Sequence, residues 1–249
     1  MRPRIAIPLP LSNNPEYVGR SLPQYEHAVR FAGGVPIRVP LDITEDEVKR
    51  LAEQCDGVLL PGGAADIDPA KYRMARHPKT ELADPHREAV DQLLIEEAYE
   101  QRKPILGICY GMQILNVFRS GSLLQHIESK INHEAGRKVK VAHQIEVDGD
   151  SRLGSMLGPV IEQSAGEKKI SIPVNSSHHQ SADVVGGGLR VVATCPDDGI
   201  VEAIEGTSPE HFVLGVQWHP ERSLENDASS PAIFRALIEN ARAQQARSR

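Results

Sequence analysis

A cysteine stands between two glycines in Gly107-Ile-Cys109-Tyr-Gly111, where an apolar strand-like run, Pro104–Cys109, meets a helix-like run, Gly111–Phe118. A sharp strand–turn–helix connection can hold a nucleophile in a strained backbone conformation, and small residues on either side let strand and helix approach. The positive end of the helix dipole favours thiolate, so we expect the pKa of the Cys109 thiol to be lowered. A buried cysteine in a glycine-rich turn would give the same letters, so this motif alone favours catalysis and a structural role about equally.

A thiol nucleophile needs a base within reach and a group that orients the base. Among the ten histidines, His219 follows a strand-like run, Phe212–Gln217, and Glu221 comes two residues later. In an extended chain, residues two apart project to the same side. The Glu221 carboxylate could therefore hold one imidazole nitrogen and leave the other for the sulfur. The alternative is a strand-end histidine paired with a surface glutamate, which a lone His-x-Glu pattern favours.

A pair of glycines, Gly62 and Gly63, follows the strand-like run Gly57–Leu60. Active sites of open α/β sheets collect at the carboxyl ends of such strands. Backbone N–H groups of Gly62 or Gly63, together with the N–H of Tyr110, could bind the oxyanion of a tetrahedral intermediate. A simple glycine turn is the plain alternative. It is the order of the three motifs, glycine pair, cysteine elbow and His-x-Glu, that favours a cysteine enzyme.

Composition excludes several classes of protein. The 249 residues are 40% hydrophobic and 25% charged, with net charge −6 and no basic block, so we expect no nucleic-acid partner. No apolar run approaches the roughly 20 residues of a membrane span. The N-terminal run is broken by Pro8 and Pro10, so it favours a first strand over a signal peptide. We therefore expect a cytoplasmic protein with no membrane association.

The cysteines suggest neither a disulfide framework nor a zinc site, because all three are widely spaced and none forms a Cys-x-x-Cys pair. We expect Cys55 and Cys195 to be small buried apolar residues. The adjacent His178 and His179 resemble a metal-binding pair. The sequence places no carboxylate or third histidine near them, so we expect no metal.

Strand-like and helix-like segments alternate through the first half, which predicts an α/β fold with a central, mostly parallel sheet flanked by helices. The predicted strands there are Arg4–Pro10, Pro36–Pro40, Gly57–Leu60 and Pro104–Cys109, and the predicted helices are Pro23–Ala32, Thr44–Gln54 with a capping box, Asp84–Gln101 and Gly111–Phe118. The second half adds strands at Val139–Val147, Leu189–Thr194, Val201–Ile204 and Phe212–Gln217, and a closing helix at Ser230–Ala243.

The chain has no Ser-, Gly- or Pro-rich linker and no internal repeat, so we expect one domain over residues 1–249. We expect Gln244–Arg249 to fray.

The three motifs resemble those of the class I glutamine amidotransferase superfamily, which also has a residue like Gln113 after the elbow. Other segments resemble the γ-glutamyl-γ-aminobutyrate hydrolase group, the C26 peptidase-like family. They are Asp66–Tyr72, Asp84–Glu88, Gly121–Ile127 and Val174–Gln180. The resemblance covers nearly the whole chain and implies a flavodoxin-like amidotransferase fold.

The resemblance also implies roles for individual residues. Cys109 would be the nucleophile, with His219 and Glu221 completing the triad. The oxyanion hole would use Gly62, Gly63 and Tyr110, and the γ-glutamyl group would lie against Gln113, Ser177 and His178. The implied substrate is a small γ-glutamyl amide, cleaved through a thioester with no metal or organic cofactor. Two positions depart from the group: Tyr110, where many members have Arg, and Arg73, where the group usually has Gly.

Three other functions are compatible with parts of this pattern. The chain could be a glutaminase that delivers ammonia to a partner synthetase, although nothing here resembles a fused synthetase. A degenerate binding protein is disfavoured because Cys109, His219 and Glu221 are all present. An α/β-hydrolase would normally place its acid well before the histidine. The sequence identifies neither the amine leaving group, for which γ-aminobutyrate, a polyamine derivative, ammonia and an amino acid are candidates, nor the oligomeric state, a homo-oligomer included.

Overall fold

The computed structural model describes residues 1–10, 15–161 and 168–247. Within them, the strands are β1 (Arg4–Pro8), β2 (Val35–Val39), β3 (Gly57–Leu60), β4 (Ile105–Ile108), β5 (Leu123–Leu124), β6 (His143–Asp148), β7 (Lys169–Val174), β8 (Ser181–Ala182), β9 (Leu189–Thr194), β10 (Val201–Gly206) and β11 (Val213–Val216). The α-helices are α1 (Pro15–Phe31), α2 (Glu45–Glu53), α3 (Pro85–Glu100), α4 (Tyr110–Phe118), α5 (Arg152–Leu157) and α6 (Ser229–Arg247).

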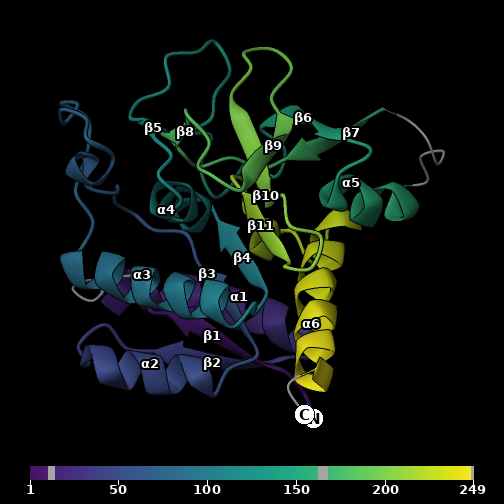
Figure 1. Cartoon of the computed structure of the whole chain (residues 1–249). Helices are drawn as coiled ribbons and strands as arrows, with labels where there is room; N and C mark the ends of the chain where they lie inside the picture. The colour runs from purple at the N-terminus through teal and green to yellow at the C-terminus, as the bar shows by residue number, and fades with distance from the viewer. Residues whose placement is uncertain (11–14, 162–167, 248–249) are drawn as a thin grey trace.

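One large sheet has the strand order β2-β1-β3-β4-β11-β10-β9-β6-β7 (Figure 1). The first five strands are parallel and keep the order of flavodoxin-like folds. The remaining four pair antiparallel and extend the sheet beyond β11. The predicted fold class, a mostly parallel α/β sheet with strands added by the second half, is confirmed.

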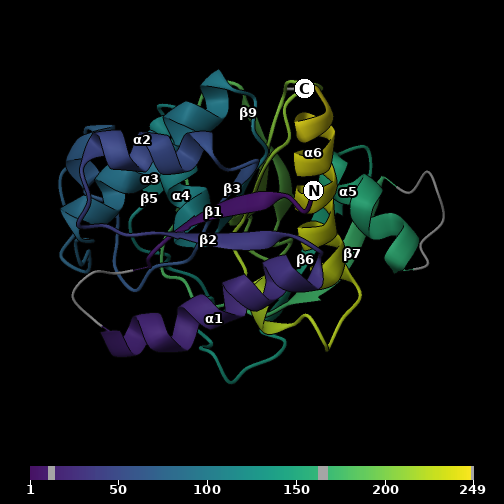
Figure 2. The same cartoon turned by 90° about the horizontal axis from the view of Figure 1, so that it is seen from below.

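Helices cover both faces of the parallel part (Figure 2). Helices α1 and α6 pack on one face with α5 beside them, and α2, α3 and α4 pack on the other, each face having its own buried apolar cluster. The predicted capping box of α2 is present: the Thr44 hydroxyl accepts a bond from Glu47 N–H, and the Glu47 carboxylate accepts one from Thr44 N–H. No helix in the described ranges is both long and apolar enough to cross a membrane.

Several predicted boundaries are wrong. Helix α1 begins at Pro15 and contains Pro23 in its interior, because its buried face extends to both sides of the proline and packing compensates for the lost backbone bond. The predicted strand at Val139 begins only at His143. Helix α6 continues to Arg247, so the predicted fraying is wrong that far, and residues 248–249 lie outside the described part. The sequence reading missed β5, β7, β8 and α5.

The elbow depends on close contact between α4 and the strands beneath it. A Cβ added at Gly111 would lie 2.1 Å from the Leu60 carbonyl oxygen, and one added at Gly107 would lie 2.5 Å from the Gly111 carbonyl oxygen. Both clashes are with backbone, which cannot move aside as a flexible side chain can. These two glycines therefore let α4 start directly against β3 and β4.

We expect Gly111→Ala to lower the free energy of unfolding by about 3 kcal/mol, the upper part of the range for overpacking a core. Gly19→Ala is the matched control, because Gly19 is an exposed residue of α1 with no atom within 4 Å of an added Cβ. That control should raise stability by about 0.5–1 kcal/mol through the better helix propensity of alanine. Urea unfolding of both variants measures the two changes, and equal effects would contradict the packing argument.

Candidate active site

Cys109 directly follows β4 and precedes the first residue of α4. Its backbone has φ 53° and ψ −107°, a conformation that is costly for a residue other than glycine. Its N–H donates to the Val216 carbonyl oxygen over 2.8 Å, which ties the elbow to the end of neighbouring strand β11. The predicted place of Cys109, at the carboxyl end of a middle parallel strand, is confirmed.

His219 and Glu221 follow β11 at the same edge of the sheet, and Glu221 lies in the short 3-10 helix η3 (Pro220–Arg222). The two side chains form a buried pair, with His219 Nδ1 2.8 Å from Glu221 Oε1. The other nitrogen of His219, Nε2, is buried without a hydrogen-bond partner among the described residues. The carboxylate therefore fixes the ring and leaves Nε2 available, as the i, i+2 spacing predicted.

Asn175 positions His219 through its backbone. The Asn175 side chain accepts a bond from His219 N–H over 3.0 Å and donates to the His219 carbonyl oxygen over 2.9 Å. Sequence reasoning missed this role, although the segment Val174–Gln180 carries part of the family resemblance. No local signal indicated it, because strand β7, which ends at Val174, was itself not predicted.

Gly62 lies between the cysteine and the histidine. A Cβ added there would be 3.1 Å from His219 Cε1 and 3.7 Å from Cys109 Cβ. The three motifs predicted from sequence thus converge at one edge of the sheet. The Gly62 N–H already donates to the hydroxyl of buried Tyr25 over 3.0 Å. Nothing in the sequence indicated that Tyr25, in the middle of α1, would reach this loop.

The Tyr110 side chain points into the core beneath the glycine pair. A Cβ at Gly63 would be 3.1 Å from the Tyr110 ring, and the Arg87 guanidinium lies 4.8 Å from the ring centroid on another side. Arg87 is itself buried, pairs with Asp91 at 2.7 Å and donates to the Pro61 carbonyl oxygen over 2.8 Å. Tyr110 and Arg87 together support the loop that carries Gly62 and Gly63. The tyrosine that replaces the arginine of many group members therefore packs beneath this loop.

The expected lowering of the Cys109 pKa is wrong. Burial raises the pKa of the Cys109 thiol to about 12, outweighing the lowering influence of Arg222 and of the Tyr110 N–H. Burial also lowers the pKa of His219, against the raising influence of Glu221. Removing a group from water disfavours its charged form whatever its sign. At neutral pH the resting pair is therefore a neutral thiol and a neutral imidazole.

The residues expected to contact substrate have protein partners. The Gln113 amide donates to the Gln180 carbonyl oxygen and to the Gln217 side chain, over 3.1 and 3.2 Å. The Ser177 hydroxyl accepts a bond from Arg222 over 2.9 Å. His178 Nδ1 lies 2.9 Å from the Gln180 carbonyl oxygen, and its Nε2 faces Glu202 at 3.5 Å. Their contact with substrate stays a prediction.

The two neighbouring histidines of the predicted pair diverge. His179 Nε2 lies 3.0 Å from the Asp66 carboxylate, whereas His178 lies with His133, His143 and Glu202 in a buried group. The premise that no carboxylate or third histidine lies near them is wrong, because residues distant in sequence meet here. These four side chains offer a set of donor atoms that suits a metal ion.

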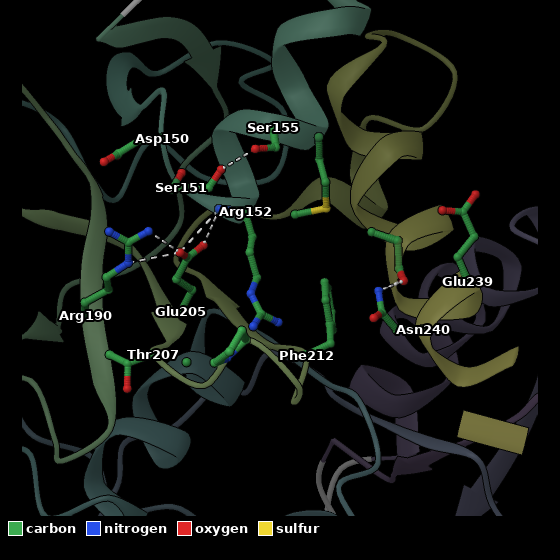
Figure 3. Close-up of a pocket in the computed structure, with 14 residues that line it drawn as sticks. Asp150, Ser151, Arg152, Ser155, Arg190, Glu205, Thr207, Phe212, Glu239 and Asn240 are labelled. Atoms are coloured by element: carbon green, nitrogen blue, oxygen red, sulfur yellow. Dashed lines mark hydrogen bonds and ion pairs between the residues drawn. The ribbon is translucent and has the colours of Figure 1, made fainter. Parts of the chain in front are cut away.

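A cavity of about 680 Å³ lies away from the cysteine (Figure 3). It opens between α5, α6 and the end of β10, at the opposite edge of the parallel strands from Cys109. Its buried carboxylate, Glu205, is already engaged by Arg190 and by the backbone N–H groups of Arg152 and Leu153 at the start of α5. Glu205 therefore has a structural role in holding the start of α5, and the cavity is not part of the candidate active site.

The open α/β sheet, with a cysteine elbow beside a buried His–Glu pair, places the protein in the class I glutamine amidotransferase-like class. A solved structure of a GMP synthase component from Thermoplasma acidophilum has the same fold, with a TM-score of 0.66 at 17% identity, over 100% of this chain and 98% of that chain. A profile of the Peptidase C26 family matches residues 11–221, and the chain belongs to that family.

Two named relatives match most of the chain. A glutamine amidotransferase-like protein of Rickettsia prowazekii is 32% identical over 256 residues, covering 86% of this chain and 86% of its own length. A γ-glutamyl-γ-aminobutyrate hydrolase of Escherichia coli O157:H7 is 33% identical over 225 residues, covering 86% of this chain and 84% of its own length.

Proposed function

We propose that this protein is a cysteine hydrolase that cleaves the amide bond of small γ-glutamyl amines, with Cys109 as nucleophile. The observation that carries the proposal is the buried His219–Glu221 bond. It leaves His219 Nε2 without a partner in the described part of the chain, beside Gly62 and the Cys109 elbow. The family and the name of the E. coli relative support the substrate class.

The reaction begins from the neutral pair. As the substrate carbonyl reaches the sulfur, the Cys109 proton passes to His219 Nε2 and the sulfur bonds to the γ-glutamyl carbonyl carbon. The protonated imidazole is stabilised by Glu221 and then gives its proton to the leaving amine nitrogen as the C–N bond breaks. Water, deprotonated by His219, attacks the resulting thioester and releases glutamate and the Cys109 thiol.

Backbone N–H groups would stabilise the oxyanion formed in both steps. The N–H of Tyr110 lies at the start of α4, beside the sulfur. The Gly63 N–H makes no hydrogen bond with any residue in the described ranges, whereas the Gly62 N–H is held by Tyr25. Tyr110 and Gly63 are therefore the better pair of donors, and Gly62 would contribute only if the Tyr25 bond opens.

The neutral resting pair predicts an unusual pH dependence. His219 acts only when neutral, and its pKa lies below the ordinary 6.5, so kcat/KM should stay level as the pH falls to about 6.5 and decline only below it. The Cys109 pKa of about 12 predicts no second inflection between pH 6.5 and 9. A pH–rate profile with a γ-glutamyl anilide measures both limbs. A rise through pH 7–9 would instead indicate a thiol that ionises in the free protein.

Two arginines, Arg222 and Arg137, lie near Glu221 of the candidate triad. Arg222 Nε lies 3.4 Å from Glu221 Oε1, and its charge acts on the Cys109 thiol. Arg137, whose Nη2 bonds to Gln24 over 2.6 Å, is near enough to Arg222 and Arg20 for their charges to lower its pKa further, after burial. A carboxylate on the leaving amine would be attracted to this cluster, which favours γ-glutamyl-γ-aminobutyrate over glutamine.

We expect Arg137→Gln to lower kcat/KM for γ-glutamyl-γ-aminobutyrate about tenfold, the equivalent of one charge contact of about 1.4 kcal/mol. The matched substrate γ-glutamyl-butylamide lacks the carboxylate and should lose less than about twofold. Free glutamate is the common readout. An equal loss of kcat/KM on both substrates would show that Arg137 does not bind the carboxylate of the leaving amine.

Comparing two substrates on the wild-type protein distinguishes the proposal from its main alternative, a glutaminase. We expect kcat/KM for γ-glutamyl-γ-aminobutyrate to exceed that for glutamine. If glutamine is the better substrate, or if hydrolysis needs a second protein, the chain is the glutaminase component of an amidotransferase, as the name of the Rickettsia relative suggests for that protein.

A further inference from the structure

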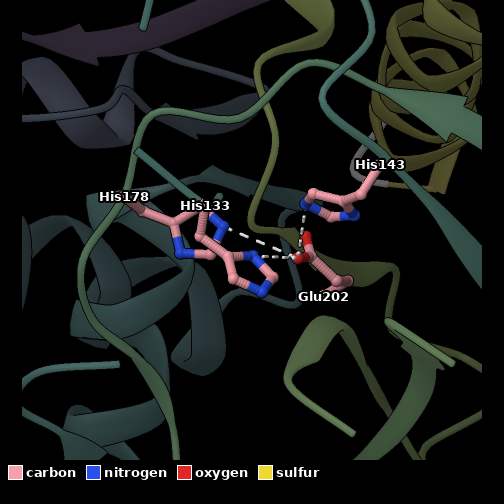
Figure 4. Close-up of side chains that lie close together, drawn as sticks. All are labelled: His133, His143, His178 and Glu202. Atoms are coloured by element: carbon pink, nitrogen blue, oxygen red, sulfur yellow. Dashed lines mark ion pairs between the residues drawn. The ribbon is translucent and has the colours of Figure 1, made fainter. Parts of the chain in front are cut away.

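Four side chains from distant parts of the sequence converge in the interior beside the candidate active site (Figure 4). His143 begins β6, Glu202 lies in β10, and His133 and His178 come from two loops. None of the four is more than 7% exposed. Since β10 neighbours β11, Glu202 lies one strand away from the segment that carries His219.

The atoms that face the centre have no hydrogen-bond partners among the residues that the structure describes. They are His133 Nδ1, His143 Nε2, His178 Nε2 and both Glu202 carboxylate oxygens. The three nitrogens lie 3.3, 3.4 and 3.5 Å from the same oxygen, Glu202 Oε1. Burying unsatisfied polar atoms is costly, and a group of five in one place requires an explanation.

The hydrogen-bond partners of the outward-facing ring nitrogens determine which nitrogen of each histidine carries the proton. His133 Nε2 lies 2.9 Å from Asp198 Oδ2, and His178 Nδ1 lies 2.9 Å from the Gln180 carbonyl oxygen. His143 Nδ1 lies 3.2 Å from the Gln144 carbonyl oxygen. These partners are acceptors only, so each ring donates outward.

A neutral histidine that donates outward presents a lone pair inward. Three lone pairs and a carboxylate facing one another repel unless a proton or a metal cation lies between them. An outer acceptor on each ring is also how metal-binding histidines are oriented in proteins.

The spacing matches a tetrahedral ion. Bonds of about 2.0–2.1 Å to zinc in a tetrahedron separate neighbouring ligand atoms by about 3.3–3.4 Å. The three nitrogen–oxygen separations lie within about 0.2 Å of that value, and all four ligand atoms lie within 4.8 Å of one another. Imidazole nitrogens and one carboxylate oxygen suit zinc better than calcium or magnesium, which prefer more oxygen ligands.

We propose that His133, His143, His178 and Glu202 bind one zinc ion as a closed, four-ligand structural site. All four positions come from the protein, so no position remains for a reacting water. The ion would join two strands to two loops at the edge of the sheet that carries the candidate active site.

The zinc site would affect catalysis only by fixing the orientation of His219. His178 belongs to the same short segment as Asn175, which holds both backbone groups of His219. Fixing His178 would therefore fix Asn175, and through it the orientation of His219. Losing the ion should lower thermal stability and also lower kcat.

Metal analysis of the full-length wild-type protein tests the proposal without relying on activity. Protein expressed in zinc-supplemented medium and dialysed should retain about one equivalent of zinc. Chelation should lower Tm by at least about 5 °C, and added Zn²⁺ should restore it. Co²⁺ added to chelated protein should give the intense visible absorption of tetrahedral cobalt.

Variants locate the ion. Glu202→Gln and His143→Ala should each retain less than about a tenth of the wild-type zinc. The matched control is His126→Ala, which removes a histidine from the nearby cluster of His126, His179 and Lys79 and should keep its full zinc content. Wild-type protein with less than about 0.1 equivalent of zinc and no rise in Tm on adding Zn²⁺ or Co²⁺ would overturn the proposal and leave a proton-bridged histidine–glutamate cluster. Full zinc retention by Glu202→Gln and His143→Ala would overturn it equally.

Discussion

Cys109→Ser should leave the protein folded and lower kcat/KM for γ-glutamyl amides by at least about 10³-fold. The side chain is 5% exposed in a tight turn, and serine fits the same space. Its hydroxyl, however, has a far higher pKa than a thiol, so His219 would have to remove a much less acidic proton. The loss corresponds to about 4 kcal/mol of transition-state stabilisation.

Cys55→Ala is the matched control for that variant. Cys55 is also buried, at 2% exposed, and burial likewise raises the pKa of its thiol, to about 11. It packs in the apolar cluster beneath α2 and α3, so its loss should cost about 1 kcal/mol of stability and leave kcat/KM unchanged. Circular dichroism and steady-state rates on both variants distinguish the two roles. Full activity in Cys109→Ser would remove the nucleophile from the proposal.

Glu221→Gln should lower kcat by about 10²–10⁴-fold with little change in KM. The Glu221 carboxylate accepts the His219 Nδ1–H bond and stabilises the imidazolium formed during the reaction. A neutral amide keeps the size of the side chain and removes that charge. Because Glu221 raises the pKa of His219, the acid limb of the pH–rate profile should also move to lower pH, which a purely structural defect would not cause.

Glu225→Gln provides the comparison, since Glu225 is exposed four residues further along the same segment. It should keep wild-type kcat and an unchanged pH profile. If Glu221→Gln lowers kcat without moving the acid limb, Glu221 does not act on the charge of His219.

The sequence alone predicted those parts of the candidate site whose residues are close together in the chain. The spacing of Gly107, Cys109 and Gly111 predicted the elbow. The clashes that an added Cβ would make at both glycines show why other residues would not fit. The spacing of His219 and Glu221 predicted their hydrogen bond. Parallel strand order then placed both motifs at one edge, because the carboxyl ends of parallel strands meet there.

The electrostatics could not be predicted in this way. A position at a helix N-terminus favours a low thiol pKa, and only the packed structure shows that Cys109 is buried enough to reverse the effect. The histidine–glutamate cluster was missed for a related reason. His133, His143, His178 and Glu202 span 70 positions of the chain, and no local spacing reveals that a sheet and two loops bring them together.

The backbone at Arg73 explains why the resembling group usually has glycine at this position. Arg73 replaces the glycine usual in the resembling group, and it has φ 60° and ψ 34°, the left-handed conformation that glycine adopts without strain. An arginine there costs about 1 kcal/mol. The sequence marked the position as unusual, but the cost is visible only from the dihedral angles.

The central claim is that Cys109 attacks the γ-glutamyl carbonyl, and a glutamine-like electrophile such as a diazoketone analogue tests it most directly. Peptide mapping by mass spectrometry after incubation should find one label per chain, on the peptide containing Cys109. Free glutamate or γ-glutamyl-γ-aminobutyrate should slow the labelling, and Cys55 and Cys195, both buried outside the site, should stay unmodified. Labels spread evenly over the three thiols, or a Cys109 that stays unlabelled while the protein hydrolyses γ-glutamyl amides, would contradict the account.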